Sequence, residues 1–306
     1  MTERRTAIVC PGQGSQRPGM LDPLPELEAL GRLLDAAEAL SGLELRAIAA
    51  TGNSEELADT RVAQPLLYLV DWAWGTTLLE CGITPVAFAG HSLGEFAALA
   101  LAGVFSVEAG LELVVERSKL MAATAQANPG SMAAVLGMDA LAISSVVSRI
   151  DNVWIANDNA PGQVVISGAT DAVEEATRAL GEAGARKVVR LDVAGPFHCP
   201  LMAPAAAAFA ELLERADFSD ARVPVLQNTE PVPESRATVI RDRLSRQITS
   251  PVRWTETMLA LVSDDPVTLI EAGPGNVLTG LARRVEGISA LSVQDTDLQS
   301  ILQEVS

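Results

Sequence analysis

Gly90-His91-Ser92-Leu93-Gly94-Glu95 is the stretch from which the fold of this chain can be inferred. An apolar run at 84–89 precedes it, and a run of helix-forming residues at 96–102 follows it. A strand, a sharp turn with a glycine on each side of a serine, and a helix form the nucleophile-elbow pattern G-x-S-x-G. Glycine is needed at both flanks because a Cβ there would clash with the neighbouring strand or helix. The pattern predicts a nucleophile, Ser92, at a helix N-terminus with free backbone N–H groups; the alternative is a loop that happens to contain these residues.

A second glycine-containing loop, Pro11-Gly12-Gln13-Gly14-Ser15-Gln16, follows a short apolar run at 6–10 that we expect to be a buried strand. A phosphate-binding P-loop needs a lysine after its last glycine, and none follows here. An oxyanion hole usually takes one backbone N–H from a loop other than the elbow. We therefore expect this loop to place one backbone N–H beside Ser92.

Composition and charge exclude several classes of function. The chain has 306 residues, 48% of them hydrophobic and 20% charged, which is ample for a packed core and argues against disorder. Its formal net charge of −17 excludes a general nucleic-acid binder and argues against attraction to anionic membranes. An acidic partner protein would need a local basic patch.

The cysteines and the N-terminus bear on metal sites and on location. The three cysteines lie far apart without CxxC spacing, so neither a disulfide framework nor a zinc site is expected. We expect no metal and no cofactor. The apolar run near the N-terminus is too short for a signal peptide, and no run approaches the roughly 20 apolar residues of a membrane span. These features predict a cytoplasmic protein.

The order of expected elements indicates an α/β fold with an inserted unit. Helical patterns cover 24–50 and 59–79, the second with Pro65 in its first turn. From 131 to 193 the pattern reads β-α-β-β-α-β, the split ferredoxin-like motif. We therefore predict a small ferredoxin-like subdomain at 129–195 inside a larger subdomain made of 1–128 and 196–306.

A serine nucleophile needs a base, and the chain contains only two histidines. His91 is adjacent to Ser92, so its side chain should point away from the serine side chain. His198 lies in a Gly/Pro-bracketed loop and is the expected base, with a purely structural histidine as the alternative. Cys199 is a rival nucleophile without an elbow. No acid is marked as the partner of His198, which leaves a backbone carbonyl as a candidate to orient it.

Five ordered blocks of sequence carry a specific resemblance. They are Gly12-Gln13-Gly14-Ser15-Gln16, Gly90-His91-Ser92-Leu93-Gly94-Glu95, Arg117, His198 and Glu271-Ala272-Gly273-Pro274-Gly275-Asn276-Val277-Leu278. Over nearly its whole length the chain resembles the malonyl-CoA:acyl carrier protein transacylases of fatty-acid and polyketide synthesis. The resemblance implies an α/β-hydrolase-like core with an inserted ferredoxin-like subdomain.

The resemblance also implies a ping-pong mechanism with malonyl-CoA and an acyl carrier protein as partners. Ser92, activated by His198, would take the malonyl group as an ester and pass it to the phosphopantetheine thiol of the carrier. By matching positions, the backbone N–H groups of Gln13 and Leu93 would form the oxyanion hole. The main-chain carbonyl of Gln247 would orient the histidine, which would explain the missing acid.

Other matching positions are implied to bind the substrate. Arg117 corresponds to an arginine that grips the malonyl carboxylate, where a guanidinium can bind bidentately. The alternative is an exposed helix arginine paired with Glu116 or Glu112. Gln64, Asn228 and His91 match further positions at the substrate pocket, although the sequence around Asn228 departs from the commoner pattern, Ser-Asn-Val-Thr.

Phe197, directly before the expected base, resembles the Phe-His pair of malonyl-selective polyketide acyltransferases. It would crowd an α-methyl branch and so disfavour methylmalonyl, by about 1–3 kcal/mol for one methylene. The alternative is that Phe197 only packs the hinge.

The carrier is acidic in systems of this kind, so docking would need basic residues near the cleft. Arg283 with Arg284, and Lys187 with Arg190, are candidates, and a solvated surface is the alternative for each pair. The family is commonly monomeric, which we also expect here.

Competing functions are an acyl-hydrolase, an acyltransferase for another extender unit, and a catalytically silent scaffold on the same fold. Arg117 argues against the hydrolase, and the Ser92–His198 pair argues against the scaffold.

Overall fold

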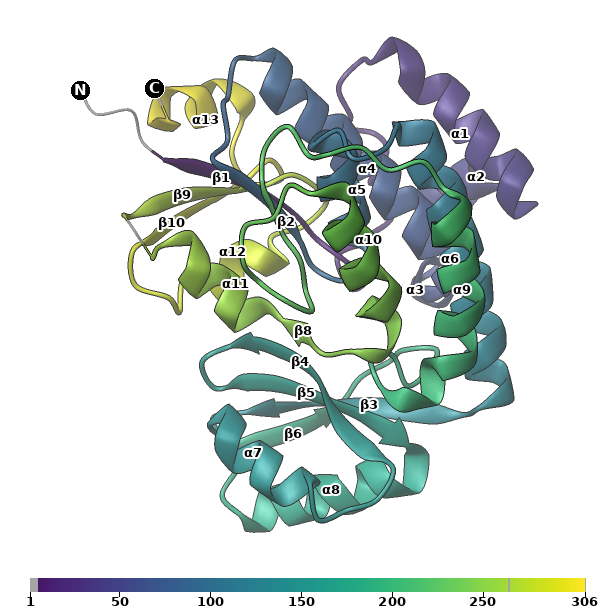
Figure 1. The fold of residues 1–306 in the computed structure, drawn as a ribbon, viewed down its shortest axis with the longest axis vertical. Helices are drawn as coiled ribbons and strands as arrows, with labels where there is room; N and C mark the ends of the chain where they lie inside the picture. Colours follow the sequence, from purple (N-terminus) through teal and green to yellow (C-terminus); the bar gives the residue numbers. More distant parts are fainter. Residues whose placement is uncertain (1–4, 264, 306) are drawn as a thin grey trace.

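The computed structural model of the protein describes residues 5–263 and 265–305. A parallel five-stranded sheet lies at the centre of its larger part (Figure 1). Its strands lie in the order β10-β9-β1-β2-β7. Their bounds are β1 Thr6–Cys10, β2 Ala87–Gly90, β7 Val225–Leu226, β9 Val267–Glu271 and β10 Ile288–Ser292. The central strand β1 and its neighbour β9 are largely apolar and wholly buried, as expected for parallel strands covered on both faces.

Helices cover both faces of this sheet (Figure 1). They are α1 Glu28–Ser41, α2 Leu45–Thr51, α3 Ser54–Ala58, α4 Thr60–Glu80, α5 Gly94–Leu101, α6 Val107–Ala127, α9 Ala203–Arg215, α10 Ala237–Arg246, α11 Trp254–Leu261, α12 Val277–Ala282 and α13 Leu298–Val305. None of the helices in the described residues combines the length and apolar content that crossing a bilayer requires.

A second sheet lies below the first in Figure 1, in the order β6-β3-β5-β4-β8. Its strands are β3 Gly130–Leu136, β4 Val153–Ala160, β5 Gln163–Ala169, β6 Lys187–Arg190 and β8 Val252–Arg253. Helices α7 (Ala140–Val147) and α8 (Thr170–Glu182) cover its outer face, giving the β-α-β-β-α-β order expected from the sequence. The sheet gains a fifth strand, because β8 pairs parallel with β4.

Two expectations about helices need correction. The helical pattern at 24–50 is two helices, since Gly42 adopts the left-handed conformation (φ 71°) and ends α1. Pro65 lies inside α4 and not in its first turn, because the side chain of Asp59 accepts a hydrogen bond from the Arg61 N–H and starts the helix earlier. The mixed α/β class itself is confirmed.

The sheet geometry brings two loops together. Cys10 at the end of β1 pairs with Gly90 at the end of β2, so the segments that follow these strands emerge at the same edge. Ligands of parallel α/β sheets bind at this carboxyl edge. The loop after β1 and the elbow after β2 therefore face the same space.

Candidate active site

The turn between β2 and α5 has the geometry of a nucleophile elbow. Ser92 occupies the left-handed region, with φ 51°, which a non-glycine residue rarely adopts. A Cβ on Gly90 would lie 2.0 Å from the carbonyl carbon of Gly94, and a Cβ on Gly94 would lie 2.0 Å from the Cys10 carbonyl oxygen. Both flanking glycines are thus required by close backbone approach, as the sequence pattern predicted.

The loop after β1 packs directly on this elbow. The His91 N–H donates to the Cys10 carbonyl at 3.0 Å, and a Cβ on Gly12 would lie 2.4 Å from the His91 carbonyl oxygen. Within residues 5–263 and 265–305, no acceptor is assigned to the backbone N–H of Gln13 or of Leu93. Leu93 directly follows Ser92 in the elbow, and Gln13 lines the cavity that contains Ser92.

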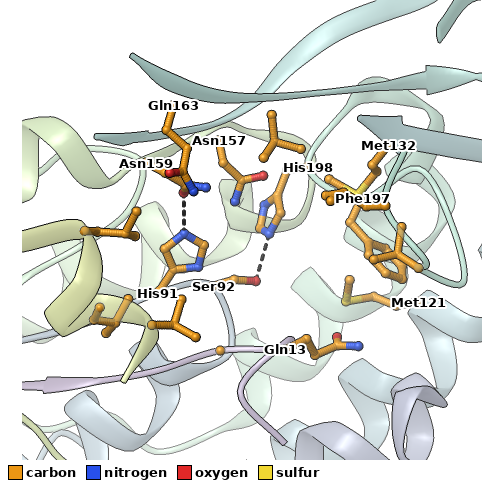
Figure 2. A pocket seen from close by; sticks show the side chains of 17 residues that line it. Gln13, His91, Ser92, Met121, Met132, Asn157, Asn159, Gln163, Phe197 and His198 are labelled. Atoms are coloured by element: carbon orange, nitrogen blue, oxygen red, sulfur yellow. Dashed lines mark hydrogen bonds between the residues drawn. The ribbon is translucent and has the colours of Figure 1, made fainter. Parts of the chain in front are cut away.

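Ser92 and His198 form a hydrogen-bonded pair, drawn as a dashed line in Figure 2, although they come from distant parts of the chain. Ser92 Oγ lies 2.8 Å from His198 Nε2. His198 Nδ1 lies 3.1 Å from the carbonyl oxygens of both Gln247 and Ser250. Carbonyl oxygens only accept, so Nδ1 carries the proton and Nε2 accepts from the Ser92 hydroxyl. The expected Gln247 carbonyl is at the histidine, with a second carbonyl beside it.

Burial keeps His198 neutral. Desolvation, together with the nearby Arg117 and His91, lowers the pKa of His198 to about 3. The imidazole is therefore unprotonated at neutral pH and is able to accept a proton from Ser92.

Arg117 on α6 is fully buried and points at the serine, so the alternative of an exposed arginine paired with Glu116 or Glu112 is wrong. Its Nη2 lies 3.3 Å from Ser92 Oγ and 3.0 Å from Gln247 Oε1. Burial lowers the pKa of Arg117 to about 10, while the Glu95 carboxylate opposes that shift. The guanidinium therefore remains charged at neutral pH.

Glutamine side chains connect Arg117 to the loop after β1. Gln64 accepts from Arg117 Nη1 at 2.8 Å and donates to the Gln13 side chain at 2.9 Å. Gln247 donates from its side chain to the Ser92 carbonyl at 3.0 Å. Amide side chains accept hydrogen bonds from the buried guanidinium without neutralising it, so Arg117 keeps its positive charge.

His91 leaves the elbow in a different direction from Ser92 (Figure 2). Its Nε2 lies 2.8 Å from Asn159 Oδ1 on β4, and its ring makes a T-shaped contact with Trp254, with ring centroids 5.6 Å apart.

Cys199, the rival nucleophile, is buried, and its thiol donates to the Pro196 carbonyl at 3.1 Å. Burial raises the pKa of Cys199, which leaves it a thiol and makes it a poor nucleophile.

A cavity opens above Ser92, between the two sheets. Figure 2 shows the apolar side chains of Met121, Met132 and Phe197 together on one side of it, and the amides of Asn157, Asn159 and Gln163 from the second sheet away from them. Further apolar side chains, from Val277, Leu278 and Leu281, also line the cavity. The three amides could not be singled out from the sequence, because strands β4 and β5 carry no motif that marks them.

Four residues expected at the substrate pocket or beside the base lie outside the cavity lining. Gln64, Arg117, Asn228 and Gln247 are buried and do not line the cavity, whereas Gln13, His91, Ser92 and His198 do. Asn228 contacts the elbow backbone, whereas Arg117 reaches Ser92 directly.

Comparison with known proteins places this site in a family. The model of the acyl transferase domain matches residues 7–295. The chain belongs to the acyl transferase family. One relative, the malonyl CoA-acyl carrier protein transacylase of Bacillus subtilis (strain 168), is 40% identical over 299 residues, covering 96% of this chain and 94% of that protein.

Solved structures of the family superpose on this acyl transferase closely. An acyl carrier protein S-malonyltransferase from Vibrio cholerae is 38% identical, with a TM-score of 0.90, covering 99% of this chain and 100% of that one. A malonyl-transacylase solved in complex with its type II PKS acyl-carrier protein is also 38% identical, with a TM-score of 0.91, covering 98% and 99% of the two chains.

Proposed function

We propose that this acyl transferase moves a malonyl group from CoA to the phosphopantetheine thiol of an acyl carrier protein. The relative from Bacillus subtilis is named a malonyl CoA-acyl carrier protein transacylase. A malonyl-transacylase of similar structure has been solved in complex with its acyl-carrier protein. The observation that carries the proposal is the charged, buried Arg117, with Nη2 3.3 Å from the nucleophile's oxygen. A cation so close to Ser92 suits an acyl group that ends in a carboxylate.

The proposed reaction has two halves that share one base. Ser92 Oγ attacks the thioester carbon while its proton passes to His198 Nε2, and the C–S bond then breaks as His198 returns the proton to the CoA thiolate. In the second half the carrier's thiol gives its proton to His198 and attacks the ester, and Ser92 regains the proton as it leaves. The backbone N–H groups of Gln13 and Leu93 bind the oxyanion of both tetrahedral intermediates. Each donor stabilises the transition state by about 3–4 kcal/mol. The mechanism requires no cofactor.

The proposal extends to the architecture. The parallel sheet with its elbow corresponds to an α/β-hydrolase-like core, made of 1–128 and 196–306. The β-α-β-β-α-β unit corresponds to a ferredoxin-like subdomain at 129–195. Its borders fall at Gly130 and Gly195, where close contacts with Pro196 and Ala125 leave no room for a side chain.

Intact-mass spectrometry after mixing with malonyl-CoA tests the function. We expect a malonyl adduct on Ser92 that disappears when holo carrier protein is added, with malonyl appearing on the carrier. Ser92→Ala should form no adduct. An adduct that is lost only to water would support an acyl-hydrolase, and no adduct on the wild type would refute acyl transfer.

Arg117→Ala tests the recognition of the carboxylate. We expect adduct formation from malonyl-CoA to fall by about 10²-fold or more, the scale of losing a charge-assisted bidentate contact. Formation from acetyl-CoA should not fall in parallel, because acetyl has no carboxylate. Arg215→Ala, at an exposed arginine on α9, is the matched control and should leave both rates unchanged.

A further inference from the structure

The strained backbone of the elbow needs support from outside the turn. Ser92 has φ 51°, a strained conformation for a non-glycine residue, which persists only where the surrounding structure stabilises it. A small relaxation of this residue would move Oγ, whose 2.8 Å hydrogen bond to His198 and 3.3 Å contact with Arg117 depend on its position.

The side chain of Asn228 forms hydrogen bonds to the backbone on both sides of the elbow turn. Asn228 Oδ1 accepts from the Ser92 N–H at 2.7 Å, and Asn228 Nδ2 donates to the Gly90 carbonyl at 2.6 Å. The Ser92 N–H only donates and the Gly90 carbonyl only accepts, so the orientation of the amide is fixed by its partners. The Asn228 amide thus bridges two peptide groups on either side of His91.

Asn228 is itself held by the helix that follows the elbow. Glu95, in the first turn of α5, accepts from the Asn228 backbone N–H at 2.8 Å and from Gln227 Nε2 at 3.1 Å. All three side chains are at most 1% exposed. Buried hydrogen bonds of this kind are stronger than exposed ones and costly to leave half made.

We propose that Asn228, held by Glu95, is a positioning residue that clamps the elbow in its reactive conformation. The clamp also occupies the Ser92 N–H, which leaves oxyanion binding to Leu93 and Gln13. Asn228 therefore acts on the reaction through the backbone of Ser92, not by contact with the acyl group. This inference rests on the proposed role of Ser92 as nucleophile.

Labelling of Ser92 by a fluorophosphonate tests the clamp without any acyl donor. Ser92 Oγ attacks phosphorus, fluoride leaves and the proton passes to His198, and intact mass reports the rate. We expect Asn228→Ala to lower the labelling rate constant by about 10²-fold, the scale of a 1 Å misplacement of a reacting group. Tyr68→Phe is the matched control, since it removes one buried hydrogen bond, to the Val107 carbonyl, and should keep the wild-type rate.

Asn228→Asp separates positioning from stability. Aspartate has the shape of asparagine and still accepts from the Ser92 N–H, but its ionised form cannot donate to the Gly90 carbonyl. Its labelling rate relative to the wild type at the same pH should be low at pH 8 and rise as the pH falls, because a protonated carboxyl donates again. If Asn228→Ala does not fold, the pH dependence of Asn228→Asp still tests whether Asn228 positions the elbow.

Several outcomes overturn the clamp. They are wild-type labelling rates in the Asn228 variants, an equal loss in Tyr68→Phe, or a ratio for Asn228→Asp that does not change with pH. A wild type that is labelled but forms no malonyl adduct would instead refute only the proposed substrate. A wild type that is not labelled would overturn both.

Discussion

Phe197 and His198 are neighbours with different tasks. Phe197 is 6% exposed and lies with Met121 and Met132 along the apolar side of the cavity, while His198 turns to Ser92 (Figure 2). The left-handed conformation of His198, with φ 57°, accompanies this divergence. We therefore expect the size of the residue at 197 to affect which acyl group fits, without altering the base.

Substitution of Phe197 should change acyl selectivity. Phe197→Leu removes volume beside the cavity, so we expect the ratio of kcat/KM for malonyl-CoA to that for methylmalonyl-CoA to fall roughly 10-fold or more, since one methylene is worth about 1–3 kcal/mol. Phe105→Leu, at a buried phenylalanine that makes an edge-to-face contact with Phe218, is the control and should lower stability without changing the ratio. An unchanged ratio in Phe197→Leu would mean that Phe197 only packs the hinge.

The low pKa of His198 predicts an unusual pH profile. A histidine with its ordinary pKa would lose activity as the base below about pH 6.5. Because the pKa of His198 is lowered to about 3, the unprotonated base persists through mildly acidic pH. We expect the fluorophosphonate labelling rate of Ser92 to stay flat from pH 8 to pH 5. A fall centred near pH 6.5 would contradict the buried, neutral imidazole.

The nucleophile and the base could be predicted from the sequence, because local sequence features mark both of them. Ser92 stands in a turn that needs two glycines, and a chain with two histidines leaves one base to choose. Ser250 and Asn159 could not be predicted, since each acts through one backbone or amide oxygen that any fold could bring close. Asn228 was expected at the pocket and lies under the elbow, because matching positions do not tell which way a side chain points.

At the scale of elements, a single carboxylate fixes the helix beside the cavity. Glu271 ends β9 and accepts from the N–H groups of Leu278 and Thr279 at 3.0 and 2.7 Å, and from the Thr279 hydroxyl at 2.8 Å. These donors are at the N-terminus of α12, whose Leu278 and Leu281 line the cavity. The Glu-Ala-Gly-Pro-Gly stretch thus connects β9 to α12, and its first residue, Glu271, caps the N-terminus of α12.

Glu271→Gln should weaken this connection. The amide keeps one acceptor and turns an NH₂ group toward backbone N–H donors, so we expect the free energy of unfolding to fall by on the order of 1–3 kcal/mol. Denaturant unfolding measures the change. Glu256→Gln, at an exposed glutamate paired with Arg253, is the control and should stay within about 0.5 kcal/mol of the wild type. Equal stability of Glu271→Gln would refute the capping role.

Elements with their own periodicity were predictable and those defined by neighbours were not. The strands and helices between 130 and 190 follow their sequence patterns. Strand β8 has two residues, too few for any alternation, and exists because the longer strand β4 pairs with it. The break between α1 and α2 at Gly42 was missed because the apolar spacing continues across it.

At the scale of the whole molecule, the net charge of −17 opposes an acidic carrier, so local basic residues must offset it. Arg283 and Arg284 follow α12 at the cavity and are exposed, and Lys187 and Arg190 are exposed on β6. Arg190 lies 3.9 Å from Glu174, which partly offsets its charge. The pair after α12 is therefore the stronger candidate for docking.

Charge reversal at this pair tests carrier docking. We expect Arg283→Glu with Arg284→Glu to raise the KM for carrier protein several-fold and to leave the KM for malonyl-CoA unchanged, with a smaller effect at high salt. Arg149→Glu with Arg178→Glu reverses the same charge at exposed positions near α7 and α8 and is the matched control (Figure 1). Unchanged carrier kinetics in the first variant would refute docking there.

The pairing of β4 with β8 has a consequence for how the chain is made. Asn157 and Asp158 on β4 pair with Val252 and Arg253, so the second sheet cannot be completed until residue 253 has left the ribosome. At about 5–20 residues per second, the edge of β4 stays open for roughly 5–20 s of synthesis. An open strand edge invites pairing with other chains. The strand that supplies amides to the cavity is therefore also exposed to misassembly while the chain is being made.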